Sequence, residues 1–362
     1  MTPNAVTSID ELVALFPYGL GFHPEDCLAF LSTRRSLALM WARIPLHHPE
    51  SGMPLATPDL AVMVSHVVTA AAAAGADGLY AVVFERERGV GAPLLDLVGA
   101  ACAQVRLRVR DVAVVHGRTR WSPWSPDDRE AVEGVPLVDA SASPAVIGCL
   151  LAGSAPFAGR DEVAALVRCD AAQADGVAQA LTRRQTLVGC GRRAPRAGRL
   201  WRRVVGSAAG TDVVTALTVD EVAALLLSLA DRDWRDAVLA GIWPGAPELV
   251  GLPAGLQHTA RRWLRPSEVA PGRVLLDRFL ALARRTPPEA PAAVAAICSV
   301  VGHVAWSLGQ GAIARDAYER ALQADPTYRL AQLGFHIVAR GVRPERGPAA
   351  GHLLGSAAAK AV

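Results

Sequence analysis

The sequence predicts an α/β N-terminal domain with a mixed sheet, followed by an all-α C-terminal region. Three observations support this division of the 362 residues. Apolar, β-branched runs alternate with helical patterns as far as residue 156. Helical spacing dominates 157–339, and from residue 340 onward Gly, Pro and Ala follow no pattern. We therefore expect an α/β domain at 1–156, a helical domain at 157–339 and a flexible tail at 340–362.

The first elements follow from a capping signal and a proline. Ser8 and Glu11 have the Ser-x-x-Glu spacing in which each side chain satisfies a free backbone amide at a helix start. The helix should end at Pro17, because proline has no N–H to donate to the helix. Two strands are expected next, over 27–32 and 36–44, joined by a tight connection.

The remainder of the α/β domain alternates helices with strands. A helix at 59–74 precedes a β-branched run at 79–85, and a helix at 93–105 precedes a run at 107–117. This order predicts some parallel pairing. If the two runs are parallel neighbours, the polar residues after them meet at one rim, where open α/β sheets bind ligands: Glu85, Arg86, Glu87, His116 and Arg118.

The second half carries helical signals throughout. Thr218 and Glu221 repeat the capping-box spacing, and apolar residues follow at helical intervals. Further helices are expected at 161–183, 255–264, 273–285, 291–308 and 312–324. The last two resemble one tetratricopeptide unit, whose small and aromatic packing positions are taken by Gly302, Gly309, Ala314, Tyr318 and Ala321. We therefore expect the region to end in a tetratricopeptide-like helical hairpin, either as local packing or as a peptide-binding groove.

Composition excludes several kinds of chemistry. Lys360 is the single lysine among the 37 Lys and Arg residues, so a Schiff-base lysine, a P-loop lysine and a lysine general base are not expected. The abundance of Ala, Gly, Pro and Arg indicates a coding bias, which weakens arginine as a sign of anion recognition. The net charge of +3 gives no argument for nucleic acid.

The cysteines and the N-terminus indicate a reducing, cytoplasmic setting. Six cysteines lie far apart without metal-ligand spacing, so we expect buried thiols, no metal and no cofactor. The first residues lack the basic start of a signal peptide, and no stretch has the roughly 20 strongly apolar residues of a membrane span. We interpret His47 and His48 as part of a loop, since adjacent side chains seldom converge on one ion.

The stretch PYGLGFHPEDC contains glycines beside a histidine and two acids. A phosphate-binding loop follows a strand and opens a helix, whereas Gly19 and Gly21 follow a helix and precede a strand. We interpret both glycines as residues with positive φ that turn the chain out of the helix. His23, Glu25 and Asp26 are candidates for binding a ligand or for acid–base work, although acids before a strand are also ordinary turn formers.

The same stretch is similar to the actinobacterial domain of unknown function 4192 family, which carries Pro-Tyr-x-x-Gly-Phe-His-Pro-x-Asp near its N-terminus. Here these residues are Pro17, Tyr18, Gly21, Phe22, His23, Pro24 and Asp26. Gly117-Arg118 with Trp121, and Asp231 with Arg235-Asp236, also match. The resemblance implies a fold and a taxon and supplies no reaction. The departures at Cys27 and His116 argue against a shared catalytic role for either residue.

The segment DRDWRD is a second candidate site. Its spacing places Asp231 with Arg235, and Arg232 with Asp236, four residues apart on a helix. Such pairs are usually solvated and contribute little. Because the segment ends an apolar stripe, a buried structural or ligand-binding role for Asp231, Arg235 and Asp236 is the alternative.

Residues 183–203 form an arginine-rich segment without an acid. A hairpin of this kind can follow phosphates, with an indole stacked on a base. A solvated surface loop is the competing interpretation. The residues that would contact nucleic acid are Arg192, Arg193, Arg196, Arg199, Trp201, Arg202 and Arg203.

No familiar catalytic motif is present, so three functions remain open. The first is the binding of a small ligand or a protein partner by a cytoplasmic protein. The second is an enzyme of unrecognised class that uses His, Asp and Arg side chains. The third is nucleic-acid binding through segment 183–203, and no membrane association is expected.

Overall fold

The computed structural model describes residues 8–35, 37–48, 51–151, 154–186, 193–207, 211–242, 269–342 and 344. They form two compact units. Unit 1 extends to Glu162 and includes Arg340–Val342, and unit 2 extends from Val163 to Ala339. The helix expected at 255–264 and most of the expected tail lie outside the described residues.

Unit 1 is built on a six-stranded sheet with the order β2-β1-β3-β4-β5-β6. The strands β3 and β4 are parallel, and each of the other neighbouring pairs is antiparallel. The expectation of a mixed sheet is therefore confirmed. The short strands β5 and β6 were not expected from the sequence. The strands span β1 Cys27–Arg34, β2 Leu37–Pro45, β3 Gly78–Phe84, β4 Arg108–His116, β5 Thr119–Trp121 and β6 Val135–Pro136.

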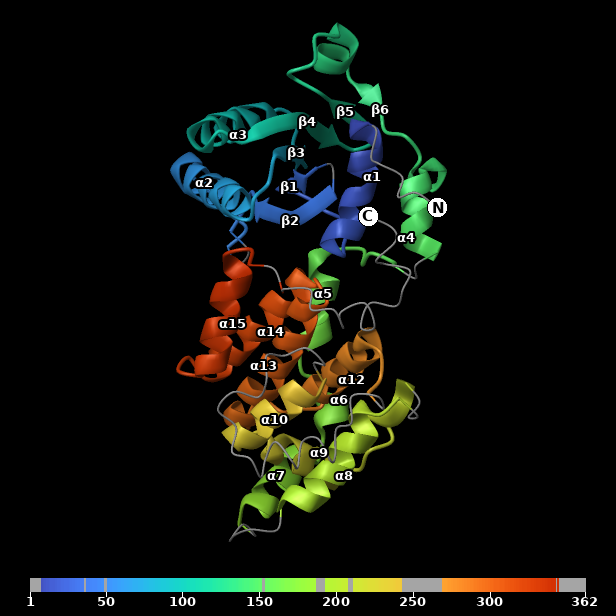
Figure 1. Ribbon diagram of the computed structural model, residues 1–362, viewed down its shortest axis with the longest axis vertical. Helices are drawn as coiled ribbons and strands as arrows, with labels where there is room; N and C mark the ends of the chain where they lie inside the picture. The colour runs from blue at the N-terminus through green and yellow to red at the C-terminus, as the bar shows by residue number, and fades with distance from the viewer. Residues whose placement is uncertain are drawn as a thin grey trace. The chain divides into compact units, whose positions relative to one another are not determined.

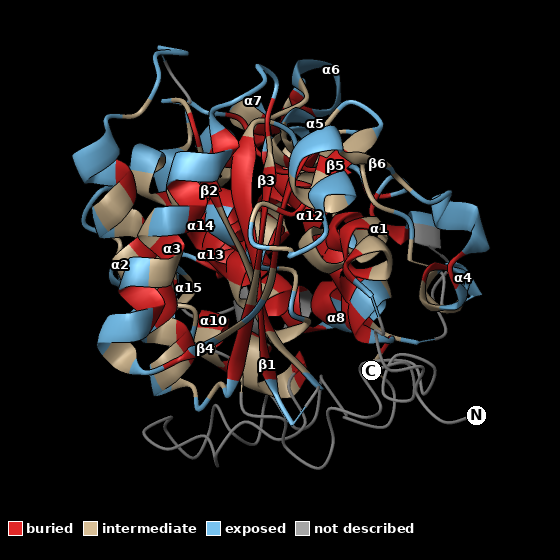
Figure 2. Cartoon of the chain, turned by 90° about the horizontal axis from the view of Figure 1, so that it is seen from above, coloured by how far each residue is buried: buried red, intermediate tan, exposed pale blue. Residues whose placement is uncertain are grey.

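Helices cover both faces of this sheet (Figure 1). On one face, α2 (Thr57–Ala73) and α3 (Gly91–Val105) bury an apolar cluster with alternate residues of β1 to β4. On the other face, α1 (Ile9–Leu20) buries the intervening residues of β1, β3 and β4. Figure 2 shows this burial concentrated on the strands and on the inward sides of the helices. Alternation along each strand therefore decides which face a side chain joins.

Three short helices follow β5 in unit 1. The helix α4 (Pro144–Leu151) packs on α1. The π-helix η1 (Arg129–Glu133) lies between β5 and β6, and the 3-10 helix η2 (Ala140–Ala142) precedes α4. The acid Asp139 caps η2 by accepting a hydrogen bond from the Ser141 amide at 2.9 Å.

The helix α1 does not end at Pro17 as its sequence predicts, because it continues to Leu20. Proline removes one hydrogen bond near the helix end, and the turn beyond it is closed by Gly21, whose N–H donates to the Pro17 carbonyl at 2.8 Å. Gly21 has φ 86°, as expected for a residue that ends a helix. Gly19 is different, since it lies inside α1 and an added Cβ would meet the Trp41 ring at 2.2 Å.

Unit 2 is helical. The single helix expected at 161–183 is three helices instead, because Asp170 caps a new start and Gly176 has φ 71°. The capping box at Thr218 and Glu221 is confirmed. The helices α8 and α15 were missed. The elements are α5 Arg160–Val167, which crosses the boundary between the units, α6 Ala171–Ala174, α7 Val177–Thr186, α8 Arg193–Val205, η3 Thr211–Val213, α9 Val219–Ser228, α10 Arg232–Ile242, α12 Gly272–Arg284, α13 Pro291–Ser307, α14 Gly311–Ala324 and α15 Arg329–Ala339.

Three arginines in unit 2 hold the carbonyl ends of helices and turns. A helix C-terminus leaves carbonyls without intrahelical donors, and a guanidinium carries several N–H groups that satisfy them. Arg278 and Arg285 are buried. The arginine-rich composition therefore has a structural use here. The acceptors are Val204 and Gly206 for Arg278, Val214 and Leu217 for Arg285, and Val167, Ala283 and Thr286 for Arg320.

The last three helices of unit 2 pack around one aromatic ring. A Cβ at Gly302 would lie 2.7 Å from the Tyr318 ring, and a Cβ at Gly334 would lie 2.1 Å from it. Both positions therefore admit glycine alone unless the ring moves. Within the described part of the chain, no helix is long and apolar enough to cross a membrane.

Candidate functional site

Strand register brings four polar loops of unit 1 to one edge of the sheet. Cys27 at the start of β1 pairs with Pro45 at the end of β2 and with Phe84 at the end of β3. Phe84 in turn pairs with Val115 near the end of β4. Because β3 and β4 are parallel, this is the edge where open α/β sheets bind ligands. The stretch at 21–26 therefore meets the rim predicted after β3 and β4.

Asp26 faces a histidine at this edge. His47 Nδ1 lies 2.5 Å from Asp26 Oδ2, an ion-pair distance, although the two groups are not aligned as a hydrogen bond. Asp26 has φ 46°, and its carbonyl accepts from the Leu46 amide at 3.1 Å. The sequence interpretation of His47 as an ordinary loop residue missed this pairing, because strand register alone brings the end of β2 beside the start of β1.

The neighbouring candidates His23 and Glu25 are exposed. The His23 amide donates to the Phe157 carbonyl at 2.9 Å, and the Phe157 amide donates to the Gly21 carbonyl at 2.9 Å. Between them, Phe22 is buried beneath Arg43, whose guanidinium lies 5.2 Å from the ring centre. The backbone of the stretch is thus fixed while two side chains face solvent.

The loop after β3 contains an internal anion. The carboxylate of Glu85, a buried side chain, accepts from the Gly89 amide at 3.0 Å and from the Gly91 amide at 2.8 Å. Gly91 is the first residue of α3, so the carboxylate lies at the positive end of that helix. The amides that would hold a phosphate in a nucleotide-binding loop are already taken by the protein's own side chain.

His116 is oriented by the same loop. Its Nδ1 lies 3.2 Å from the Glu85 carbonyl oxygen. A carbonyl only accepts, so Nδ1 donates in this contact, and in the neutral ring Nε2 is then the acceptor. The contact therefore fixes the orientation of the imidazole and the tautomer of its neutral form.

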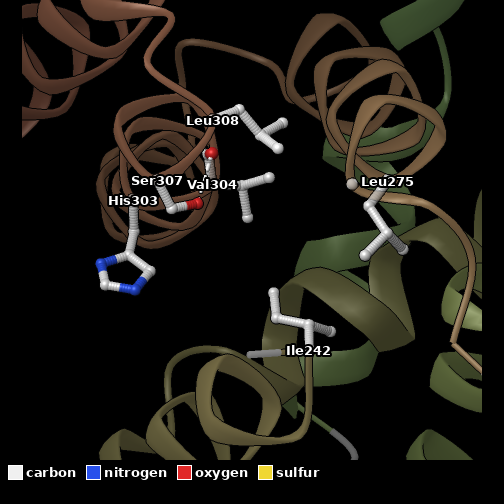
Figure 3. Close-up of a pocket in the computed structure, with 7 residues that line it drawn as sticks. Ile242, Leu275, His303, Val304, Ser307 and Leu308 are labelled. Atoms are coloured by element: carbon white, nitrogen blue, oxygen red, sulfur yellow. Dashed lines mark hydrogen bonds between the residues drawn. The ribbon is translucent and has the colours of Figure 1, made fainter. Parts of the chain in front are cut away.

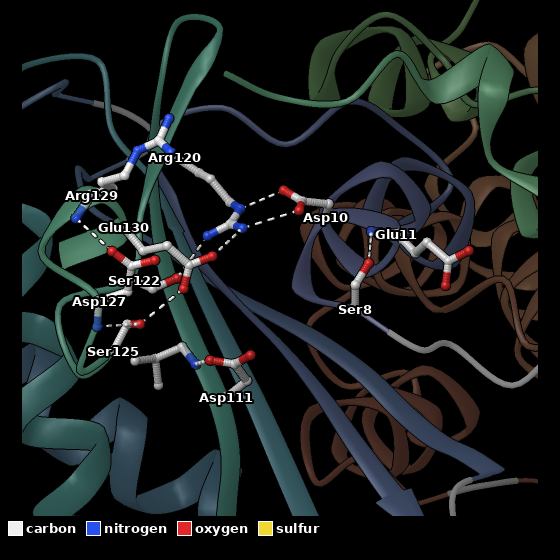
Figure 4. Close-up of polar contacts among 11 residues, drawn as sticks. Ser8, Asp10, Glu11, Asp111, Arg120, Ser122, Ser125, Asp127, Arg129 and Glu130 are labelled. Carbon is white, nitrogen blue, oxygen red and sulfur yellow. Dashed lines mark hydrogen bonds and ion pairs between the residues drawn. The ribbon is translucent and has the colours of Figure 1, made fainter. Parts of the chain in front are cut away.

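A buried cation anchors β5 beside this edge (Figure 4). The Arg120 guanidinium pairs with Asp10 of α1 and donates to Glu130 at 2.9 Å and Ser122 at 2.9 Å. Its side chain is 4 % exposed. The two carboxylates raise the Arg120 pKa above its ordinary value, with the Asp10 hydrogen bond as the largest cause, and they outweigh burial, which alone lowers it. The arm formed by β5 and η1 is thus fixed to α1.

The second candidate cluster belongs to unit 2, whereas the sheet edge belongs to unit 1. Asp231 accepts from the Trp234 amide at 3.1 Å at the start of α10. Arg235 is buried; it pairs with the adjacent Asp236 at 2.7 Å and donates to the Tyr328 hydroxyl at 2.7 Å. These contacts replace the pairs expected four residues apart. They tie α10 to the turn before α15.

The arginine-rich segment contradicts the stacking interpretation of Trp201. That ring is fully buried, and its Nε1 donates to Ser228 Oγ at 2.8 Å, so it is unable to stack on a base. The reason is the helical period of α8, which turns Trp201 inward while Arg199, Arg202 and Arg203 remain exposed. Arg193 and Arg196 also lie in α8, and Arg192 lies outside the described residues.

The three buried thiols are poor nucleophiles. Burial raises the pKa of Cys27, of Cys102 and of Cys298 to about 11 each. Within the described ranges, no group of three or more His, Cys, Asp or Glu residues has the geometry of a metal site.

A small pocket in unit 2 offers little room (Figure 3). It is lined by α13 residues including His303 and Ser307, together with Ile242 and Leu275. Its cavity volume is about 10 Å³, enough for roughly one water molecule. Burial lowers the pKa of His303, which favours a neutral ring.

The chain matches the family model described as Domain of unknown function (DUF4192) over residues 10–345. The chain belongs to this family. The match begins in α1 and continues beyond α15, so it includes both units and both candidate clusters. It confirms the resemblance drawn from Pro17 to Asp26. No curated protein and no solved structure matches the chain.

Proposed function

We propose that the protein binds a small ligand at the edge of the unit 1 sheet where β3 and β4 end. The observation that carries this proposal is the register that aligns Cys27, Phe84 and Val115. It brings Asp26, Glu85 and His116 from separate segments to one edge. A sheet edge of this kind, with helices on both faces, is the usual ligand position in α/β folds.

Orientation of the imidazoles supports the same proposal. Asp26 faces His47, and the Glu85 carbonyl fixes the tautomer of His116. Both rings are partly exposed, and each has its Nδ1 close to an oxygen atom from a separate segment of the chain. Acid–base catalysis on the bound ligand is the second candidate, because a carboxylate beside an imidazole is the arrangement that positions a general base.

A screen of small molecules against the full chain tests the proposal. A compound present at about 100 times its Kd should stabilise the folded state by about 2.7 kcal/mol. We expect the stabilisation to be lost in Asp26→Asn and in His116→Asn. His48→Asn is the matched control, since His48 is exposed and neighbours the paired His47. A compound that still stabilises both site variants would refute the assignment of the ligand site to this edge. Chemical turnover of the compound would favour the enzyme hypothesis.

The hairpin of α13 and α14 is proposed to be tetratricopeptide-like. Its support is the packing of Tyr318 against Gly302, two of the positions that the repeat fills with aromatic and small residues. Hydrogen–deuterium exchange in the presence of an extended peptide tests whether the hairpin binds a protein partner. Protection of α13 and α14 by the peptide would support peptide binding, and no protection would mean that the hairpin serves local packing alone.

A further inference from the structure

The edge of unit 1 contains a cation held on an aromatic platform. The guanidinium of Arg88, in the loop after β3, lies 4.7 Å from the centre of the Trp121 ring. Trp121 pairs with Val114, so its side chain lies on the α3 face of the sheet. An added Cβ at Gly134 would approach the indole to 2.6 Å, which shows how closely that backbone packs on the ring.

The platform is fixed from the opposite face as well. Arg120 precedes Trp121 in β5, so it points to the α1 face, where it pairs with Asp10. The strand is therefore held by a buried ion network on one face and by close packing on the other. A fixed ring restricts the cation above it, which reduces the ordering cost when that cation binds a ligand.

The charge of Arg88 is available. In the described part of the chain no ion pair or hydrogen bond of Arg88 accompanies the contact with the Trp121 ring, and the side chain is exposed. A cation–π contact uses the face of the guanidinium and leaves its N–H groups free. The buried carboxylate of the same loop, Glu85, accepts from the Gly89 and Gly91 amides, and it makes no ion pair with Arg88 among the described residues.

Arg88 shares this edge with two further exposed arginines, Arg86 and Arg118. The exposed acids at the edge are Glu87 in the same loop and Glu25 before β1. His116 lies two residues beyond Val114 on the same face, about 7 Å along β4. In the neutral ring its Nε2 is an acceptor, which suits a hydroxyl group more than a phosphate oxygen.

Resting on the small-ligand function proposed above, we propose that this edge binds a phosphorylated hydroxy compound. Arg88, held over Trp121, binds the phosphate, and His116 Nε2 accepts a hydrogen bond from a hydroxyl of the same ligand. The internal carboxylate of Glu85 keeps the α3 amides occupied, so the phosphate is bound by a side chain at the rim and not by a helix N-terminus.

Calorimetric titration of the full chain with inorganic phosphate and with glycerophosphate, at constant ionic strength set by chloride, tests this proposal. We expect both to bind, glycerophosphate more tightly. Arg88→Gln should weaken both by at least about tenfold, the usual effect of losing a charged hydrogen bond. Arg108→Gln, at an exposed arginine that begins β4 at the opposite edge of the sheet, should change neither. His116→Asn should remove the advantage of glycerophosphate and leave phosphate binding intact.

Equal effects of Arg88→Gln and Arg108→Gln would overturn the proposal, as would no phosphate binding by the wild-type chain. Arg88 is exposed, so its substitution is not expected to prevent folding, and a circular dichroism melt checks this. A neutral or cationic compound could instead protect residues 85–91 and 116–121 from hydrogen exchange and bind Arg88→Gln with unchanged affinity. That result would refute phosphate as the ligand group and would retain the proposed small-ligand function. No stabilising compound of any class would refute both.

Discussion

Replacement of Arg120 by methionine should destabilise unit 1 and reveal strong coupling to Asp10. The side chain is 4 % exposed and binds two carboxylates and the Ser122 hydroxyl. Removing one member of a buried ion pair costs about 3–5 kcal/mol. Because Asp10 and Glu130 retain contact with water, at 23 % and 33 % exposure, we expect the lower end of that range, about 3 kcal/mol.

Asp10→Asn should cost less, about 1–2 kcal/mol, since Glu130 still neutralises the guanidinium. In the double variant Arg120→Met/Asp10→Asn the second change has no cation left to affect. The double variant should therefore cost about the same as Arg120→Met alone. The coupling energy should exceed about 1 kcal/mol, well above the few tenths expected of independent sites.

Hydrogen exchange of the β1 and β3 amides, measured at equilibrium in native buffer, reports the free energy of opening unit 1 separately from unit 2. Additive costs within about 0.5 kcal/mol would show that Arg120 and Asp10 are not coupled. That result would also remove the reason for treating the β5 arm and Trp121 as fixed.

Further predictions concern four other positions. The pKa of Glu130 is lowered, first by its hydrogen bond from Arg120. The carboxylate therefore stabilises unit 1 fully above the ordinary Glu range, and this stabilisation is lost as pH falls below that range. In Glu130→Gln the free energy of unfolding of unit 1 should depend less on pH over the acid range. The thiol of Cys298, with a pKa of about 11, should resist iodoacetamide at neutral pH and react on unfolding, as peptide mass spectrometry would detect. Gly334→Ala should raise the unfolding rate and cost about 1–3 kcal/mol by pushing the Tyr318 ring, with Tyr318→Leu relieving the cost; an equal cost in both backgrounds would contradict the packing. Trp201→Ala should lower the stability of unit 2 by about 3–5 kcal/mol, measured by urea unfolding, while nucleic-acid affinity in a gel shift stays the same.

Local signals in the sequence determined most of the elements. The capping box at Thr218, the β-branched runs of β3 and β4, and the glycine that ends α1 each depend on residues within a few positions of one another. Errors arose where a distant contact decided the outcome. The helix α1 continues past Pro17 although one hydrogen bond is lost there, and Gly19 is required by the Trp41 ring on β2.

The candidate site shows the same division. The sequence alone determined the alternation of strands and helices, the family resemblance through His23 and Asp26, and the polar residues that follow β3 and β4. It left open whether those strands were parallel neighbours. Only the tertiary structure decided that Asp26 meets His47, that Glu85 fills its own loop, and that Trp201 is buried. The physical reason is that strand register and helix facing are set by burial of apolar surface across the whole sheet or bundle, which no short stretch of sequence specifies.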